Sequence, residues 1–200
     1  MTEHSARSLV LASASPRRRE LLAKLGVSFA AQAPDIDEAV CAGELPQPYV
    51  QRMARQKAAA LIPSVGPNIA VLAADTTVVA AGRILGKPSD RAACAAMLKL
   101  LSDAEHHVYT GVALALDGHL WERFSVTTVQ FRALTTAEMA AYWATGEPAG
   151  KAGGYAIQGL GAAFVREIRG SYSGVVGLPL FETAELLTIA GYPVILDGND

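Results

Sequence analysis

Along the chain, stretches whose apolar residues are spaced as in strands alternate with stretches whose apolar residues are spaced as in helices. Residues 9–12 form a four-residue apolar run, which is typical of a buried strand. The run 69–74 is continuous enough for a central strand covered on both faces. Two β-rich segments, about 106–116 and 120–131, are joined at Asp117-Gly118, which is a strong hairpin signal. The pattern therefore predicts buried strands and a long hairpin.

Apolar residues at helical spacing predict helices between these strands. The first begins at Pro16, after Ser15, carries leucines as far as Leu25 and closes at Gly26. The other helices are predicted at 48–62, at 90–101, from 135 onward, and up to about 190. Shorter strands are predicted at 27–31, 78–81 and 163–168, and a turn at 170–174. The informative positions are those where polar residues interrupt this pattern.

The first interruption lies at the start of the first helix. Ser13 and Ser15 precede three consecutive arginines there, at positions 17, 18 and 19. A helix start already carries unpaired N–H groups and partial positive charge, so basic residues do not stabilise it unless an anion is present. Oriented N–H groups, hydroxyls and guanidinium groups together predict a site for a phosphate chain. The alternative is a Ser15 N-cap followed by solvated arginines.

A lysine interrupts the apolar stripe of the second helix. Val50, Met53 and Ala54 share this stripe with Lys57, at a position where an apolar residue is expected. A lysine on an inward face must either extend its ammonium group to solvent or meet an anion. Both alternatives stay open from the sequence, and the second makes Lys57 a candidate binding residue.

Carboxylates mark two further points. Asp75 directly follows the buried run 69–74, and the end of a buried strand is where α/β proteins place catalytic and metal-binding groups. We therefore expect Asp75 to be functional, with a helix cap or turn former as the alternative. Residues 34–38 carry three carboxylates, ending in Glu38. They form either a solvated loop or an oxygen-rich edge that helps to hold a divalent cation.

Glycine is dense between residues 146 and 161. This density is costly in backbone entropy, so either something approaches the backbone closely or the chain needs positive φ angles there. Gln158 is one of the few larger polar groups in the segment. Tyr155, Ile157 and Leu160 are expected to anchor it, against the alternative of a long mobile loop.

Two other groups of polar residues fit no complete motif. Residues 86–88 (Gly-Lys-Pro) differ from a P-loop, because the glycine spacing is one residue short and proline replaces the required Ser or Thr. A lysine held near phosphates by the preceding turn remains as an interpretation of Lys87. His106, His107 and His119 lack the spacing of metal ligands and are expected at the surface or at strand edges.

Composition narrows the class of protein. With 200 residues, 51% hydrophobic content and two cysteines, the chain is expected to be a reduced, cytoplasmic, globular protein. It is expected to form a single domain over 1–200, or two small lobes, with a frayed tail over 191–200. A net charge of −2 argues against nucleic acid as a partner. No apolar stretch is long enough for a membrane span, so no membrane partner is expected.

The candidate residues combine cationic groups with carboxylates. This combination suits a metal-bound polyphosphate, because the bases neutralise non-bridging oxygens while the carboxylates hold a divalent ion and a water. The sequence contains neither a cysteine–histidine nucleophile pair nor a dinucleotide fingerprint. The residues therefore predict attack by water on a phosphoanhydride.

Four stretches, in order along the chain, resemble the Maf family of nucleotide pyrophosphatases. They are residues 11–22, 74–76, 86–88 and 170–180. The resemblance implies an α/β fold with an elongated mixed β-sheet flanked by helices and two lobes around a central cleft, similar to inosine triphosphatases. It also implies hydrolysis of nucleoside triphosphates to the monophosphate and pyrophosphate with a divalent metal cation, Mg²⁺ or Mn²⁺, and often a homodimer.

Residues 152–159 resemble the branch of the family that acts on dTTP and UTP, and not the branch that acts on 7-methyl-GTP. The resemblance implies that Asp75 is the catalytic general base. It ties substrate choice to Arg17, Thr76 and Gln158. It places further polar residues along the cleft: Ser13, Arg18, Glu38, Lys57 and Lys87. We expect the divalent ion to be held by Asp75, with Glu38 as a second ligand.

The chemistry of two side-chain types agrees with these roles. The Gln158 carboxamide offers one donor and one acceptor, which match the O4 and N3–H edge of uracil or thymine, although a flipped amide also accommodates cytosine. Helical phase places Arg18 on the inward stripe, toward the phosphates, and leaves Arg17, about 100° away, for the other end of the nucleotide. Arg19 is expected in solvent.

Two alternatives to a dTTP and UTP pyrophosphatase stay open. One is a broader house-cleaning pyrophosphatase for non-standard nucleotides such as 7-methyl-GTP. The other is a non-catalytic nucleotide-binding regulator of cell division. Because the chain carries a full set of carboxylates and bases, we expect catalysis, with modified pyrimidine nucleotides among the substrates.

Overall fold

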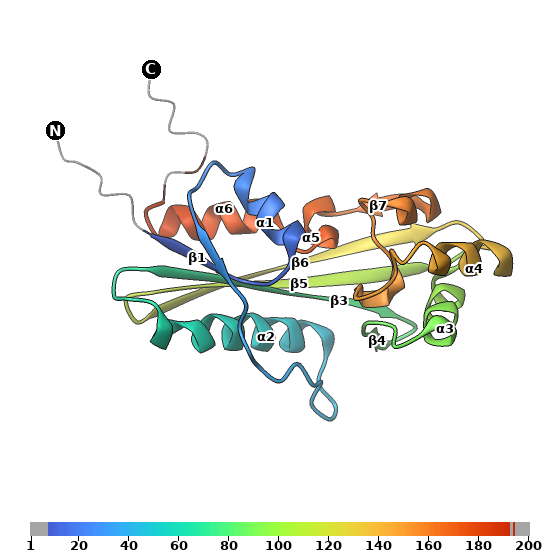
Figure 1. Cartoon of the computed structure of the whole chain (residues 1–200), viewed down its shortest axis with the longest axis horizontal. Helices are drawn as coiled ribbons and strands as arrows, with labels where there is room; N and C mark the ends of the chain where they lie inside the picture. The colour runs from blue at the N-terminus through green and yellow to red at the C-terminus, as the bar shows by residue number, and fades with distance from the viewer. Residues whose placement is uncertain (1–7, 193, 195–200) are drawn as a thin grey trace, which may run out of the picture. The chain divides into compact units, whose positions relative to one another are not determined.

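The structure, a computed structural model, describes residues 8–192 and 194, and Figure 1 shows the course of the chain. Its strands are β1 (Leu9–Ala12), β2 (Ala30–Gln32), β3 (Ala70–Ala80), β4 (Arg83–Leu85), β5 (Glu105–Leu116), β6 (His119–Phe131) and β7 (Val165–Arg169). Its α-helices are α1 (Pro16–Ala23), α2 (Pro46–Leu61), α3 (Arg91–Leu101), α4 (Thr136–Ala144), α5 (Tyr172–Val176) and α6 (Leu180–Ile189). Short 3₁₀ helices are η1 (Ile62–Ser64), η2 (Ala152–Gly154) and η3 (Leu160–Phe164).

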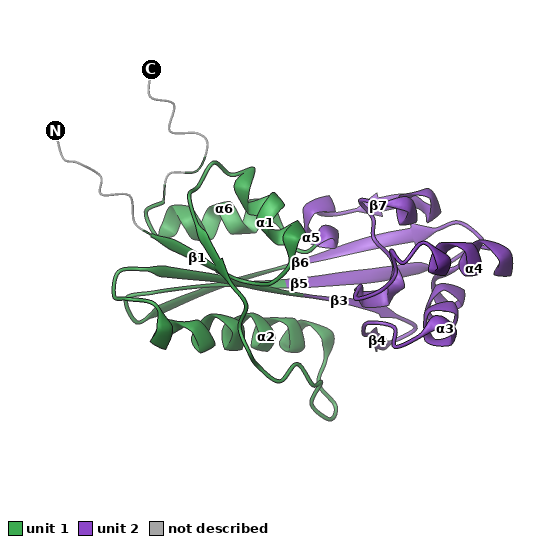
Figure 2. Cartoon of the chain, viewed as in Figure 1, with its two compact units in different colours: residues 1–75, 111–124, 177–200 green, residues 76–110, 125–176 purple. Residues whose placement is uncertain are grey.

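The described strands form one mixed seven-stranded sheet in the order β2-β1-β3-β5-β6-β7, with β4 paired to β3. Strand β1 is parallel to β2 and β3, whereas β4 and β7 pair with their neighbours in antiparallel fashion. The predicted α/β class, a mixed sheet flanked by helices, is confirmed. The chain divides into two compact units, residues 1–75, 111–124 and 177–200, and residues 76–110 and 125–176 (Figure 2). The central cleft and the single domain over 1–200 stay predictions.

In the first unit, helices cover both faces of the sheet, with α2 on one face and α1 and α6 on the other (Figure 1). Two small residues of α2, Ala54 and Ala58, pack with Val10 of β1 in one buried cluster. Helix α2 approaches β5 closely at Gly111, where a Cβ atom would lie 2.6 Å from the Val50 carbonyl oxygen. Because only glycine allows this contact, the helix is held directly against the strand.

In the second unit, four aromatic rings pack together within a core that is otherwise mostly aliphatic. The Phe131 ring meets the rings of Tyr155 and Phe164 edge-on, and the Tyr142 ring meets Phe164 in the same way. Edge-to-face pairs of this kind place the positive rim of one ring on the negative face of the next. Strand β6, helix α4 and the glycine-dense segment are thereby packed together.

Local signals predicted several boundaries correctly. The helix predicted at 90–101 is observed as α3, which begins after Asp90, and the Asp90 carboxylate caps it. The hairpin between β5 and β6 turns at Asp117 and Gly118, whose φ angles are 50° and 77°. Residues 170–174, predicted as a turn, instead lead into the short helix α5, because the Ser171 hydroxyl accepts a hydrogen bond from the N–H three residues later.

The predicted frayed tail begins too early. Tyr192 is buried, and its hydroxyl donates a hydrogen bond to the Ser8 carbonyl at 2.8 Å. The chain is therefore still packed one residue beyond Gly191. The rest of the predicted tail, residues 193 and 195–200, lies outside the described residues. Among the residues that are described, no helix is both long and apolar enough to span a membrane.

One histidine prediction is wrong. His106 is 1% exposed, and its Nε2 atom lies 2.8 Å from the Tyr155 hydroxyl, while the ring meets Phe131 edge-on. His107 and His119 are exposed, as predicted. Successive side chains of a strand point to opposite faces, so only one of the two adjacent histidines can lie in solvent.

Burial of His106 predicts a pH-dependent stability. Burial, with a smaller contribution from His107, lowers the pKa of His106 to about 4, whereas an unfolded histidine titrates near 6.5. Between these values the unfolded state binds more protons, so stability is expected to fall as the pH falls from 6.5 to 4, by up to about 3 kcal/mol. Urea unfolding across this range measures the change.

The matched variant for this experiment is His106→Gln. Its amide does not titrate, yet it can still form a hydrogen bond with the Tyr155 hydroxyl. The loss of stability between pH 6.5 and 4 is expected to be smaller in the variant, because other titrating groups contribute equally to both proteins. Equal losses would contradict the assignment to His106.

Candidate active site

The sequence offered two interpretations of the start of α1, a site for phosphates and a Ser15 N-cap followed by solvated arginines. The structure shows features of both. Ser15 is the N-cap, and its hydroxyl accepts from the Arg18 N–H at 3.4 Å. Ser13 is buried at the end of β1, and its hydroxyl accepts from the Ser15 N–H at 3.1 Å. Arg17 is half-buried and Arg19 is exposed, as predicted for Arg19. The serines therefore order the turn that presents the arginines.

Arg18 points inward, as its helical phase predicts. Its Nε–H donates to the Gly177 carbonyl at 2.8 Å, which fixes the guanidinium group between α1 and the segment that leads into α6. Burial lowers the pKa of Arg18 from its usual range, while the carboxylates of Asp75 and Glu38 act to raise it. An arginine stays protonated in proteins, so these contacts place a fixed positive charge within electrostatic reach of both carboxylates.

Lys57 is buried, and it meets anions from its own chain. Its Nζ atom lies 2.6 Å from Asp75 Oδ1 and 2.6 Å from Glu38 Oε1. The Lys57 and Asp75 side chains are 8% and 9% exposed, whereas that of Glu38 is 43% exposed. Of the two alternatives for Lys57, the structure therefore supports an inward ammonium group paired with carboxylates. This pairing joins α2, β3 and the acidic loop.

The backbone position of Asp75 differs from the prediction. Asp75 does not end a strand but lies within the continuous strand β3, and Asp75 and Thr77 are both buried. The strand continues because Thr76 and Thr77 are β-branched residues that fit a pleated sheet. The absence of glycine or proline after Asp75 in the sequence was the signal for this continuity. Strand residues therefore lie both before and after Asp75, and the sheet fixes the position of its backbone.

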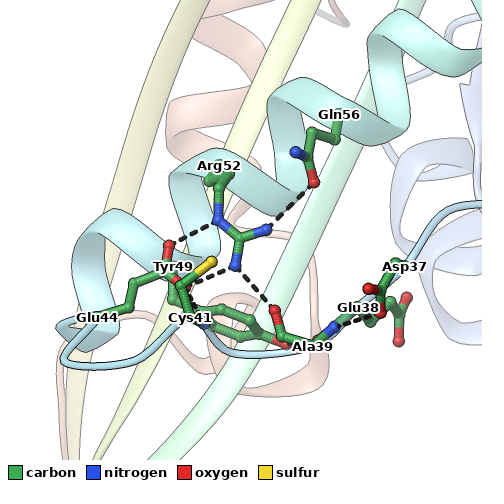
Figure 3. Close-up of polar contacts among 8 residues, drawn as sticks. All are labelled: Asp37, Glu38, Ala39, Cys41, Glu44, Tyr49, Arg52 and Gln56. Carbon is green, nitrogen blue, oxygen red and sulfur yellow. Dashed lines mark hydrogen bonds and ion pairs between the residues drawn. The ribbon is translucent and has the colours of Figure 1, made fainter.

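The acidic loop that carries Glu38 is held against α2 by an arginine (Figure 3). The Arg52 guanidinium forms two hydrogen bonds of 2.6 Å with the Glu44 carboxylate and one of 2.9 Å with the Ala39 carbonyl. The Tyr49 hydroxyl donates to the Glu38 carbonyl at 3.0 Å. The contact with Arg52 lowers the pKa of Glu44 to about 2. Sequence reasoning missed Arg52, because a contact between a loop and a helix eight residues on has no local signature.

Asp75 and Glu38 form the pair expected to hold a divalent cation. Within residues 8–192 and 194, no group of three or more His, Cys, Asp or Glu side chains is arranged to hold a metal ion. The two carboxylates share the Lys57 ammonium group, which lies 2.6 Å from one oxygen of each. Magnesium in phosphate sites uses one or two protein carboxylates together with substrate phosphates. The pair therefore supplies the type of ligand that a divalent ion arriving with a polyphosphate uses, and the metal site itself stays a prediction.

In the second unit, Thr76 belongs to a short chain of hydroxyl groups. Its Oγ1 atom lies 3.0 Å from Thr110 Oγ1, and Thr110 donates to the Gly174 carbonyl at 2.8 Å. Because the Thr110 proton is committed to this carbonyl, Thr76 is the donor in the pair of threonines. The hydroxyl of Thr76 is thereby oriented by the backbone of α5.

Lys87 and Gln158 are both exposed, on two segments of the second unit that contact each other. The Gly153 N–H donates to the Gly86 carbonyl at 3.0 Å, which joins the turn before Lys87 to the glycine-dense segment. Gly153 has a φ of 68°, and a Cβ atom there would lie 3.0 Å from Val78. Both reasons expected for the dense glycine, close approach and positive φ, therefore apply.

The anchoring of the glycine-dense segment was predicted only in part. Tyr155 and Ile157 are each 5% exposed, which confirms two of the three anchors. Leu160 is 59% exposed, so its prediction is wrong. Its backbone is held instead, because the Leu160 N–H donates to the Glu147 carboxylate at 2.9 Å.

The structure thus gathers part of the predicted site. In the first unit, contacts or electrostatic effects connect Arg18, Glu38, Lys57 and Asp75. In the second unit, the segments of Lys87 and Gln158 are joined through their backbones, and Thr76 is oriented separately. The roles of these residues in binding, catalysis and substrate choice stay predictions.

The chain is an α/β protein with a mixed sheet, and it holds cationic side chains beside a pair of carboxylates. Proteins of this class are suited to anionic ligands. The chain belongs to the Maf-like protein family, whose model matches residues 8–190. The resemblance seen in the sequence is therefore confirmed.

Two curated relatives illustrate the similarity. The chain is 53% identical to the dTTP/UTP pyrophosphatase of Cereibacter sphaeroides, over 94% of this chain and 97% of the relative. It is 54% identical to the dTTP/UTP pyrophosphatase of Sphingopyxis alaskensis, over 94% of this chain and 98% of the relative. Among solved structures, the Staphylococcus aureus Ham1 protein matches with 13% identity and a TM-score of 0.43, over 62% of this chain and 71% of that one. At that TM-score, nothing about this chain follows from the last match.

Proposed function

We propose that this chain is a nucleoside triphosphate pyrophosphatase that hydrolyses dTTP and UTP to the monophosphate and pyrophosphate. Relatives with this name share more than half of its residues over nearly their full length, which supports the substrate class. The observation that carries the proposal is the buried Lys57, whose ammonium group is shared by the carboxylates of Asp75 and Glu38. A buried cation beside two carboxylates is the combination that phosphoanhydride hydrolysis needs.

In the proposed reaction, Asp75 accepts the proton of the water that attacks the α-phosphorus. The bond between the α-phosphorus and the bridging oxygen breaks, and pyrophosphate leaves. Lys57, Lys87 and Arg18 neutralise the charge that develops on this leaving group. A divalent cation, Mg²⁺ or Mn²⁺, when held by Asp75 and Glu38, would supply further charge neutralisation at the phosphates.

Base selection is proposed to rest on Arg17, Thr76 and Gln158. The Gln158 amide pairs with the O4 and N3–H edge of uracil or thymine. The Thr76 hydroxyl has a direction imposed by Thr110, which supports a role that depends on orientation. The cytoplasmic location expected from the composition and the homodimer implied by the family resemblance belong to the same proposal. The net charge of −2 supports the absence of a nucleic-acid partner.

The test is pyrophosphate release from a panel of nucleotides, with and without Mg²⁺. The panel contains dTTP, UTP, CTP, 5-methyl-UTP and the triphosphates of inosine and 7-methylguanosine. We expect dTTP and UTP to show the highest kcat/KM, and release to require the metal. In Gln158→Ala we expect kcat/KM for dTTP and UTP to fall about 10- to 100-fold, because a polar group of the base loses its partner.

Inorganic triphosphate, which carries no base, is the control ligand for this variant, since its dissociation constant is expected to change much less. Preference for the 7-methylguanosine or inosine nucleotide would instead indicate a broader house-cleaning pyrophosphatase. Tight nucleotide binding without turnover of any nucleotide would indicate a non-catalytic regulator. Either result would overturn the proposed substrate or the proposed catalysis.

A further inference from the structure

The Glu147 carboxylate, which precedes the glycine-dense segment, accepts three hydrogen bonds. The Tyr142 hydroxyl donates to Oε1 at 2.7 Å, the Gly161 N–H donates to Oε1 at 3.0 Å, and the Leu160 N–H donates to Oε2 at 2.9 Å. Two consecutive backbone N–H groups of the segment are thus held by one side chain. None of the site roles described above uses Glu147.

Tyr142, on α4, holds the other end of the same segment. Its hydroxyl accepts from the Ala156 N–H at 3.0 Å while it donates to Glu147. Burial, together with the hydrogen bond to Glu147, raises the pKa of Tyr142, so the hydroxyl keeps its proton. Tyr142 and Glu147 therefore hold residues 156–161 at both ends, and Gln158 lies in the turn between them.

Two glycines of the segment are explained by this arrangement. A Cβ atom at position 159 would collide with the Glu147 carboxylate, and one at position 161 would lie 2.7 Å from the Tyr142 hydroxyl oxygen. Glycine at these positions lets the carboxylate and the hydroxyl reach the backbone. The sequence and the contacts therefore agree that the backbone, and not a side chain, is what Glu147 and Tyr142 bind.

The charge of Glu147 strengthens these contacts. Burial acts to raise the pKa of Glu147, but the hydrogen bonds from Tyr142, Gly161 and Leu160 outweigh it and leave the pKa below its usual range. An ionised carboxylate forms stronger hydrogen bonds with N–H and O–H donors than a neutral acceptor does. The turn that carries Gln158 is thus fixed by charge-assisted bonds.

We propose that Glu147 and Tyr142 are positioning residues that hold the turn around Gln158 in the conformation that recognises the pyrimidine edge. The inference rests on the proposed function, in which Gln158 selects the base. The side chains of Tyr155 and Ile157, both of which precede Gln158, are buried, but their burial fixes only where the segment lies. Glu147 and Tyr142 fix how the turn itself is oriented, because they bind its backbone.

The functional test is a double-mutant cycle between Glu147→Gln and Gln158→Ala. A glutamine at 147 keeps the shape but replaces one acceptor with an NH₂ group, which faces a backbone donor. We expect kcat/KM for dTTP to fall about 10-fold, mainly through KM, with little change in the dissociation constant of inorganic triphosphate, which carries no base. In the Gln158→Ala background, Glu147→Gln is expected to cost less than about 2-fold. Glu167→Gln, an exposed glutamate of β7, is the matched control and is expected to change neither value.

Full multiplicative losses in the double variant would overturn the inference, because Glu147 would then act independently of Gln158. Tyr142→Phe is the second variant, since it removes only the hydroxyl, and the same pattern is expected. Amide hydrogen exchange without nucleotide decides the structural part separately. We expect faster exchange at Leu160 and Gly161 in Glu147→Gln, and unchanged protection there would also overturn the inference.

Failure of the proposed function has a different signature. It would appear as absence of pyrophosphate release by the wild-type protein itself. In that case the ratio of the dTTP and inorganic triphosphate dissociation constants replaces kcat/KM in the same cycle. An equal ratio in the wild type and Glu147→Gln would overturn the inference about positioning.

Discussion

Replacing Asp75 with asparagine is expected to lower kcat for dTTP hydrolysis by about 10³-fold, because the variant cannot accept a proton from the attacking water. The substitution preserves shape, and the amide oxygen can still accept from the Lys57 ammonium group. Lys57 also keeps its contact with Glu38. The fold is therefore expected to survive. Initial rates of pyrophosphate release and a thermal unfolding curve measure the two effects.

Asp117→Asn is the matched control for this prediction. Asp117 lies in the hairpin turn between β5 and β6, where asparagine also tolerates the positive φ of 50°. It changes one carboxylate to an amide without touching the candidate site, and wild-type activity is expected. Wild-type activity in Asp75→Asn would contradict the assignment of Asp75 as the general base.

Replacing Lys57 with methionine is expected to affect both stability and activity. The methionine keeps most of the buried stem but leaves the Asp75 carboxylate, 9% exposed, beside Glu38 without the shared cation. Breaking a buried ion pair by removing one partner costs about 3 kcal/mol, and we expect a loss of this size in urea unfolding. We also expect kcat to fall about 10²-fold, because one positive charge at the leaving group is lost.

Mg²⁺ provides a second measurement on this variant. The ion should stabilise Lys57→Met more than the wild-type protein, because the two carboxylates are no longer neutralised by the ammonium group. Lys99→Met, at an exposed position of α3, is the control and is expected to unfold like the wild type. Wild-type stability in Lys57→Met would contradict the shared-cation arrangement. An equal effect of Mg²⁺ on both proteins would contradict the metal-binding role of the pair.

The parts of the fold with local signals were predictable from the sequence. The start of the helix α3 at Asp90 and the turn at Asp117 depend on residues within a few positions of each other, and both predictions are confirmed. The apolar stripe of α2 likewise predicted that Lys57 faces inward. What the stripe left open was the partner, because Asp75 and Glu38 reach Lys57 only through the pairing of strands and the folding of a loop.

The errors have a common physical origin. Strand β3 was expected to end at Asp75 because polar residues follow a buried run, but threonine fits a strand as well as an apolar residue does. His106 was expected at the surface, although its alternation with the exposed His107 puts it in the core. Glu147 was missed because its partners are backbone groups, and glycine density was the only sequence signal of their approach.

The distance between Lys57 and Asp75 is set far from either side chain. Helix α2 rests on β5 at Gly111, two turns of helix away from Lys57, and the contact leaves no room for a methyl group. A larger residue at that position would lift the helix, and with it the ammonium group, by a fraction of an ångström. The position of the Lys57 ammonium group therefore depends on how closely α2 packs against β5. A polymorphism at Gly111 that looks like an ordinary core change would act as a change in the active site.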